Sequence, residues 1–91
     1  MFQFEWDARK ATSNLRKHGI SFDEAVSVFG DALAVTYADT DHFESEHRSR
    51  TYGLSARGRL LVVVHTERQG NIRIISARKA TRHEETIYEQ G

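Results

Sequence analysis

Cysteine and proline are both absent from the sequence, and the lack of cysteine excludes whole classes of protein. No disulfide framework and no thiolate metal site can form, which fits a reducing compartment. Long apolar runs are also absent, since the longest, residues 60–64, is far too short to span a bilayer. The N-terminus carries acids at Glu5 and Asp7 and lacks the basic start and apolar stretch of a secretion signal. We therefore expect a cytoplasmic protein that does not associate with a membrane.

The formal net charge is 0, but the two halves of the chain are charged oppositely. The 91 residues predict one domain, 1–91, and 29% charged with 38% hydrophobic residues is typical of a folded globular protein. Residues 1–47 carry nine acids and four bases, whereas residues 48–91 carry nine bases and four acids. Eight of those nine bases are arginines, whose planar guanidinium matches phosphate oxygens. The asymmetry indicates a surface for a polyanion, unless the two halves pair with each other across the fold.

Glycines and capping residues divide the chain into eight predicted elements. Ser21 with Glu24, and Thr81 with Glu84, form the sequence pattern of a capping box at the start of a helix. The predicted elements are a strand over 2–6, helices over 8–18 and 22–29, strands over 32–37, 48–55, 59–67 and 72–79, and a C-terminal helix that ends near residue 89.

The order β-α-α-β-β-β-β-α predicts the α+β class, because successive strands joined by short turns must be antiparallel. We expect an antiparallel meander sheet with two N-terminal helices on one face and a short C-terminal helix.

The last hairpin holds the first candidate site. A tight turn after Glu67 sets the register. The expected pairs are Glu67 with Ile72, Thr66 with Arg73, His65 with Ile74, Val63 with Ser76, and Leu61 with Arg78. Without a bulge, Glu67 and His65 then share a face with Ser76 and Arg78, and Arg73 points to the other face; a bulge is expected to bring Arg73 and His65 together.

These residue types suit RNA cleavage without a metal. Such cleavage needs a base for the ribose 2′-OH, donors for the charge that develops on phosphorus, and an acid for the leaving oxygen. Glu67 or His65 is the candidate base, and His65, His83 or Tyr88 the candidate acid. The candidate phosphate ligands are Arg73, Arg78 and Arg82.

Residues 78–83 concentrate three bases and a histidine at the start of the last predicted helix. The helix dipole disfavours cations there, while a helix N-terminus binds anions, so the segment indicates a phosphate site. Pairing with the acids of the 39–46 segment is the competing interpretation.

The individual candidates also have plainer interpretations. His65 suits a half-buried core histidine, Glu67 a solvated turn, and Arg73 an edge charge that blocks aggregation. The acidic loop over 39–47 offers oxygen and histidine ligands but lacks the glycine and the spacing of a calcium loop. We predict that this loop is solvated, and that the protein holds no metal and no cofactor.

Three stretches of the chain resemble the BrnT family of bacterial toxins, in order and over nearly its whole length. They are residues 4–7 with 14–22, residues 58–67, and residues 73–81 followed by Glu84 and Tyr88. The resemblance implies a RelE-like fold and a ribonuclease that blocks translation. It also implies neutralisation by a DNA-binding, BrnA-like ribbon-helix-helix antitoxin, with which the toxin represses its own operator DNA.

On this basis we assign catalysis to His65, Glu67, Arg73, Arg78 and Tyr88. RNA binding is assigned to Arg48, Arg50, Lys79, Arg82 and His83. The alternative is a non-catalytic module that binds nucleic acid or a partner protein through the same arginine-rich surface.

Overall fold

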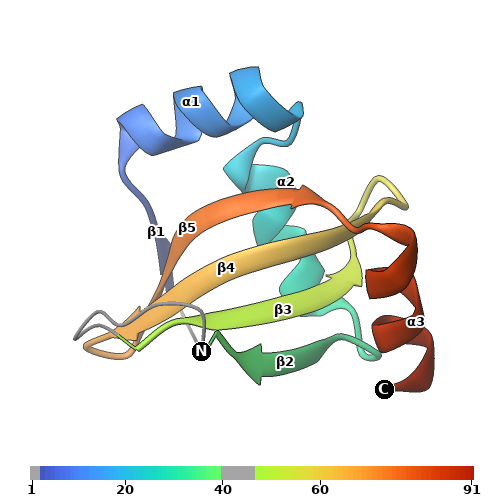
Figure 1. Cartoon of the computed structure of the whole chain (residues 1–91). Coiled ribbons are helices and arrows are strands. Elements are labelled where there is room, and N and C mark those ends of the chain that lie inside the picture. Colours follow the sequence, from blue (N-terminus) through green and yellow to red (C-terminus); the bar gives the residue numbers. More distant parts are fainter. Residues whose placement is uncertain (1–2, 40–46) are drawn as a thin grey trace.

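The fold is a five-stranded sheet with three α-helices, seen in a computed structural model that describes residues 3–39 and 47–91 (Figure 1). The elements in chain order are β1 (Gln3–Glu5), α1 (Ala8–His18), α2 (Phe22–Ser27), the 3-10 helix η1 (Val28–Gly30), β2 (Val35–Ala38), β3 (Ser49–Leu54), β4 (Leu60–Arg68), β5 (Asn71–Lys79) and α3 (Arg82–Gln90). The mixed α+β class is confirmed. Most of the loop predicted to be solvated and metal-free, residues 40–46, lies outside the described residues.

The strands lie in the order β1-β5-β4-β3-β2. Strands β2 to β5 form an antiparallel meander, but β1 runs parallel to β5, so the expectation of a purely antiparallel sheet is wrong at this edge. Parallel neighbours need a long connection, and here the helices and the other strands supply it. Strand β1 pairs with β5 only from Asn71 to Arg73, and the rest of that edge lies near α1.

Local capping explains the limits of α1. The Asp7 carboxylate accepts hydrogen bonds from the backbone N–H groups of Arg9 and Lys10, at 2.8 and 3.2 Å. Gly19 ends the helix in the left-handed conformation, with φ of 70°. The helix therefore spans the predicted residues, Ala8–His18.

Helix α2 departs from its sequence pattern at both ends. Ser21 caps it by accepting a hydrogen bond from the Glu24 N–H, but Glu24 does not reach back to complete the box. Its carboxylate is instead bound by the Arg59 guanidinium and by the Ser55 hydroxyl, which holds the pKa of Glu24 below its ordinary value. The helix gives way to the tighter η1 at Val28, so the predicted single helix over 22–29 is shorter than expected.

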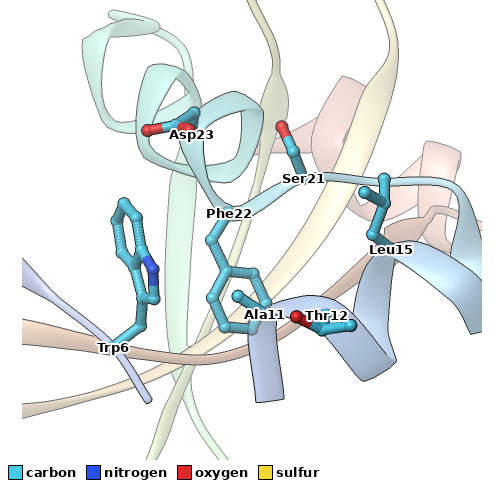
Figure 2. A pocket seen from close by; sticks show the side chains of 7 residues that line it. All are labelled: Trp6, Ala11, Thr12, Leu15, Ser21, Phe22 and Asp23. Carbon is cyan, nitrogen blue, oxygen red and sulfur yellow. The ribbon is translucent and has the colours of Figure 1, made fainter. Parts of the chain in front are cut away.

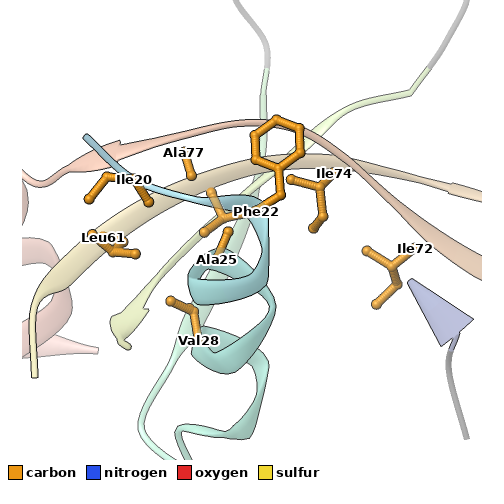
Figure 3. Packing of buried hydrophobic residues seen from close by; sticks show 9 residues of the cluster. Ile20, Phe22, Ala25, Val28, Leu61, Ile72, Ile74 and Ala77 are labelled. Atoms are coloured by element: carbon orange, nitrogen blue, oxygen red, sulfur yellow. The ribbon is translucent and has the colours of Figure 1, made fainter. Parts of the chain in front are cut away.

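The main core lies between α2 and one face of the sheet. Phe22, at the start of α2, belongs to this core. Its ring meets the Trp6 ring edge-on, with centroids 5.9 Å apart, beside the hollow between α1 and α2 (Figure 2). Ala25 follows Phe22 along the buried side of α2, Val28 continues that side at the start of η1, and both pack over the sheet (Figure 3). The sheet residues of this cluster are Leu61, Val63, Ile72, Ile74 and Ala77. This helix-covered face holds the sheet together, so the opposite face is available for a site. No helix in the described ranges is long and apolar enough to cross a membrane.

Asn14 fastens α1 to the part of the β5 edge that β1 does not reach. Its buried amide donates to the carbonyls of Ile20 and Ala77, at 2.9 and 2.8 Å, and accepts from the Ala77 N–H at 3.0 Å. These backbone groups would otherwise lie at a buried edge without a partner.

We expect Asn14→Ala to lower the free energy of unfolding by about 3 kcal/mol, because it leaves buried backbone groups unsatisfied. Urea denaturation measures this, with exposed Ser13→Ala on the same helix as the matched control. Equal stability of the two variants would show that the Asn14 bonds do not fasten α1.

Candidate functional site

The turn between β4 and β5 fixes the first part of their register. Gln69 and Gly70 both have positive φ, 53° and 83°, which gives the two-residue turn favoured in hairpins. The pairs Glu67–Ile72, Thr66–Arg73 and His65–Ile74 are confirmed. Up to this point, turn chemistry alone sets the pairing.

A β-bulge then shifts the register, with Ile75 as the extra residue. Val64 pairs with Ser76, Val63 with Ala77, Val62 with Arg78 and Leu61 with Lys79. The predicted pairs Val63–Ser76 and Leu61–Arg78 are therefore wrong.

The bulge decides which candidate side chains share a face. Directly paired residues point to the same side of a sheet. Arg73, Ser76 and Arg78 therefore lie together on the face opposite His65 and Glu67. The bulge unites the two arginines and does not bring Arg73 to His65, which corrects both expectations for this hairpin.

We call the surface with Arg73 and Arg78 the open face, and its residues form three rows across the strands. The first row is Val35, Tyr52, Val62 and Arg78; the second is Tyr37, Arg50, Val64 and Ser76; the third is Thr66, Arg73 and Glu5.

Helix α3 covers the first row. The Arg78 guanidinium donates two hydrogen bonds to the Glu84 carboxylate, at 2.7 and 2.9 Å, and a Cβ at Gly91 would collide with Val35 at the far end of the row. Glu84 also accepts from the Thr81 N–H, so the predicted capping box of α3 is confirmed. The Arg78 hydrogen bonds, more than any other cause, lower the pKa of Glu84 to about 2, which keeps it ionised and the guanidinium fixed.

The second row is the middle of the open face, and no helix of the described residues covers it. Tyr37 is 51% exposed, and its ring packs against Tyr52 with centroids 6.1 Å apart. Arg50 pairs with the buried Asp39 at 3.2 Å and keeps 27% of its side chain exposed. An exposed aromatic ring on which a nucleic-acid base can stack therefore lies beside a guanidinium that can bind a phosphate.

In the third row, Glu5 of β1 holds Arg73. Their side chains are joined at 2.8 Å, with 27% of Arg73 and 37% of Glu5 exposed. The bond from Arg73, followed by one from Asn71, lowers the pKa of Glu5. A single Arg73 nitrogen, Nη1, makes this contact, and in the described residues the other two nitrogens have no hydrogen-bond partner.

Both interpretations of the charge asymmetry describe part of the molecule. Arg50, Arg59 and Arg73 each pair with an acid of the first half, as expected if the halves bind each other. Arg50, Arg73 and Arg78 nevertheless gather on one face and remain partly exposed. The acids hold the guanidinium groups in place without burying them.

His65 lies on the helix-covered face. It is 9% exposed, its Nε2 is 2.7 Å from the Thr51 hydroxyl, and its ring meets Phe29 edge-on at 4.9 Å. Burial lowers its pKa to about 4, so the ring is neutral at pH 7. This is the environment of a core histidine.

The other predicted residues lie around the rim. Glu67 is exposed beside the hairpin turn, and Lys79 is exposed at the end of β5, both on the side of the helix-covered face. Tyr88 donates to Asp31 at 2.7 Å, which raises the pKa of the tyrosine and ties α3 to the segment before β2. The remaining RNA-binding candidates are Arg82 and His83, exposed in the first turn of α3, and Arg48, half-buried before β3.

Sequence reasoning missed Tyr37, Glu5 and Glu84 as parts of this face. Val35 and Tyr37 are two residues apart in β2 and therefore lie on the same face of the sheet. This alternation was the signal from which the position of Tyr37 could have been predicted. In the described part of the chain, no group of three or more metal-ligating acids or histidines is placed to hold an ion.

Comparison with known proteins gives a family match and a structural match that agree. A family model described as the ribonuclease toxin BrnT of type II toxin–antitoxin systems matches residues 6–84. The 1.1 Å crystal structure of the Brucella abortus ribonuclease toxin BrnT superposes with a TM-score of 0.68 at 19% identity, covering 90% of this chain and 100% of that one. No curated protein sequence matches significantly.

The buried His65 predicts an acid-sensitive fold. Its pKa is about 4 in the folded protein against 6.5 ordinarily, so the unfolded chain binds the extra proton as pH falls from 6.5 to 4. Stability should decline through that window by up to about 3 kcal/mol. His65→Gln keeps a partner for Thr51 but cannot titrate, so its denaturation midpoints should decline less. The exposed His83→Gln is the control, and identical profiles for His65→Gln and wild type would refute the assignment.

Proposed function

This chain belongs to the BrnT family of type II ribonuclease toxins, and from that premise we propose that it cleaves RNA on the open face of its sheet. The observation that carries the proposal is the bulge at Ile75, which places Arg73 and Arg78 on the same face as Arg50. We assign the reaction to metal-independent attack by the ribose 2′-OH.

The three arginines surround Ser76 and Val64. Arg78 is two residues and Arg73 three residues from Ser76 along β5, which is about 7 and 10 Å at the rise of a strand. Arg50 lies two strands away, again about 10 Å. Glu84 raises the pKa of Arg78, and the positive charge of nearby Arg50 opposes that rise. Guanidinium groups at these positions can reach inward to a phosphate over the Val64–Ser76 pair.

In the proposed reaction the 2′ oxygen bonds to phosphorus, and the bond from phosphorus to the 5′ oxygen breaks. The 2′ proton passes to a solvent water molecule and the leaving oxygen takes a proton from solvent, giving a cyclic phosphate and a 5′-hydroxyl. The three arginines stabilise the negative charge that develops on phosphorus, each such donor contributing about 3 kcal/mol. Glu5 and Glu84 are positioning residues, because they orient the guanidinium groups before RNA binds.

This assignment differs from the one made on the sequence. His65 is buried on the other face and Glu67 opens to solvent on that same side, so neither can reach a phosphate over Ser76. Tyr88 is engaged with Asp31. Electrostatic stabilisation by preorganised arginines therefore replaces the histidine and Glu67 as the main source of rate.

We further propose that the protein has a RelE-like fold and acts in the cytoplasm, where cutting RNA inhibits translation. A BrnA-like ribbon-helix-helix antitoxin would neutralise it, and the complex would repress its operator DNA. The description of the family as the toxin of a type II pair supports an antitoxin partner.

Removing the guanidinium groups should abolish activity. We expect Arg73→Ala and Arg78→Ala each to lower cleavage of a single-stranded RNA by about 100- to 1000-fold and to relieve growth arrest on expression. Arg78→Lys keeps the charge but loses the bidentate geometry of the guanidinium, so its cleavage activity should lie between those of wild type and Arg78→Ala. Arg57→Ala, in the exposed β3–β4 turn, is the matched control.

Thermal unfolding of each variant separates lost chemistry from lost folding, because Arg78→Ala leaves Glu84 without its partner. If folded Arg73→Ala and Arg78→Lys proteins remain fully active, the open face is not the active site. If the wild-type protein binds RNA but leaves it intact, the non-catalytic binding module is the correct function.

Metal independence has its own test. Cleavage by wild-type protein should be unchanged within about twofold after dialysis against EDTA, because guanidinium groups supply the positive charge that a metal would otherwise provide. The control adds Mg²⁺ back to the dialysed protein. Loss of activity on chelation, restored by the metal, would contradict this mechanism.

A further inference from the structure

Helix α1 carries a second concentration of positive charge, outside the open face. Its eleven residues include four exposed bases and no acid. The bases are Arg9, Lys10, Arg16 and Lys17. Across residues 3–39 and 47–91, none of these four forms an ion pair, whereas Arg50, Arg59, Arg73 and Arg78 all do. These four bases are therefore exposed cations grouped on one helix, in addition to the exposed Arg57, Lys79 and Arg82 elsewhere in the described chain.

Two of these bases face a groove. Lys10 and Lys17, with His18, line a cavity of about 190 Å³ whose opposite wall is Ile75 and Ser76 of β5. The lysines are seven residues apart, or about 10 Å along the helix, and so stand on one side of it. The groove exists because β1 ends beside Arg73 and Asn14 draws α1 against the remaining edge.

Ser76 belongs to both surfaces. It closes the second row of the open face, which starts at Tyr37 and passes through Arg50, and it also forms part of the groove wall. Asp7, at the start of α1, has its pKa lowered mainly by the backbone N–H groups of Lys10 and Arg9, with smaller contributions from the charges of Lys10 and Arg73. The arginine cluster, by which we mean Arg50, Arg73 and Arg78 of the open face, therefore adjoins the α1 groove at the β5 edge.

We propose that Lys10, Lys17 and His18 form a second phosphate-binding subsite, for the part of the RNA strand that leaves the arginine cluster over the β5 edge. This inference rests on the proposed function, since it extends the same substrate path. Ammonium groups suit the purpose because they bind phosphates as point charges without fixing a base. An RNA strand is favoured over an acidic protein segment because the groove continues directly from Ser76, which lies at the centre of the proposed cleavage site.

The test compares two double variants that remove the same charge from the same helix. Lys10→Gln/Lys17→Gln changes the groove, whereas Arg9→Gln/Arg16→Gln changes bases that line a neighbouring hollow with Ala8, Thr12 and Ser13, of which only Ser13 also lines the groove. The probes are a 12-nucleotide single-stranded RNA and a trinucleotide, both fully 2′-O-methylated so that they cannot be cut. Their Kd values are measured from 50 to 300 mM salt, and melting curves check that both variants fold.

We expect the lysine variant to weaken binding of the 12-nucleotide RNA about tenfold at low salt and to reduce the salt slope by about 1.4, which corresponds to two phosphate contacts on a single strand. In this variant the 12-nucleotide RNA should no longer bind more tightly than the trinucleotide. The arginine variant should change its affinity by less than about threefold, as a general effect of net charge.

Equal weakening by both variants would overturn the subsite, because it would show an effect of charge rather than of the groove. Normal RNA binding by the lysine variant together with weaker antitoxin binding would also overturn it, and would assign the groove to a protein partner. A parallel cleavage assay on wild-type protein with unmodified RNA keeps the two hypotheses apart. Absence of cutting there counts against the proposed function, whereas normal cutting with an unaffected lysine variant counts against the subsite alone.

Discussion

One side-chain amide joins three segments of the chain. Asn14 binds the Ile20 carbonyl after its own helix and both backbone groups of Ala77 on β5. A strand edge that is buried must have its N–H and C=O groups satisfied, and β1 is too short to do so beyond Arg73. The amide therefore takes the place of a neighbouring strand at one point. By fixing α1 there, it also sets how the basic side of that helix faces the bulge.

Much of the fold was predictable because helix ends and tight turns depend on local sequence signals. Asp7 and Gly19 mark the ends of α1, and the pair Gln69–Gly70 marks the hairpin, because caps and tight turns depend on residues close in the chain. The parallel partner of β1 depends on the whole intervening chain and leaves no local trace. The early end of α2 is similar: the Val28 side chain comes so close to Gly53 that a Cβ there would lie 2.7 Å from it. Such an approach belongs to tertiary packing.

The candidate site was predictable in its chemistry but not in its geometry. The excess of arginine in the second half predicted guanidinium groups on a common surface, and Arg50, Arg73 and Arg78 do lie on one face of the sheet. Which face they occupy depends on the bulge, and Ile74-Ile75 reads as an ordinary apolar run in which no residue marks the extra position. The face assignment of Arg78 and Ser76 was reversed for that reason. The ion pair between Arg73 and Glu5 was equally hidden, since it joins residues 68 positions apart in the chain.

The extra residue in β5 also bears on how this strand can evolve. If β5 kept Ile75 but lost the bulge, Arg78 would pair with Leu61 and turn toward the side now occupied by Ala77, a position with no exposure to solvent. Losing Ile75 itself would instead restore regular alternation and leave Arg78 opposite Val62 on the open face. Replacement of a single side chain has a local cost, whereas one further inserted residue, unless a second bulge absorbs it, inverts every position beyond it. Among homologues, an added residue between the hairpin turn and the last arginine of the strand should therefore be rarer than replacement of the residues in between.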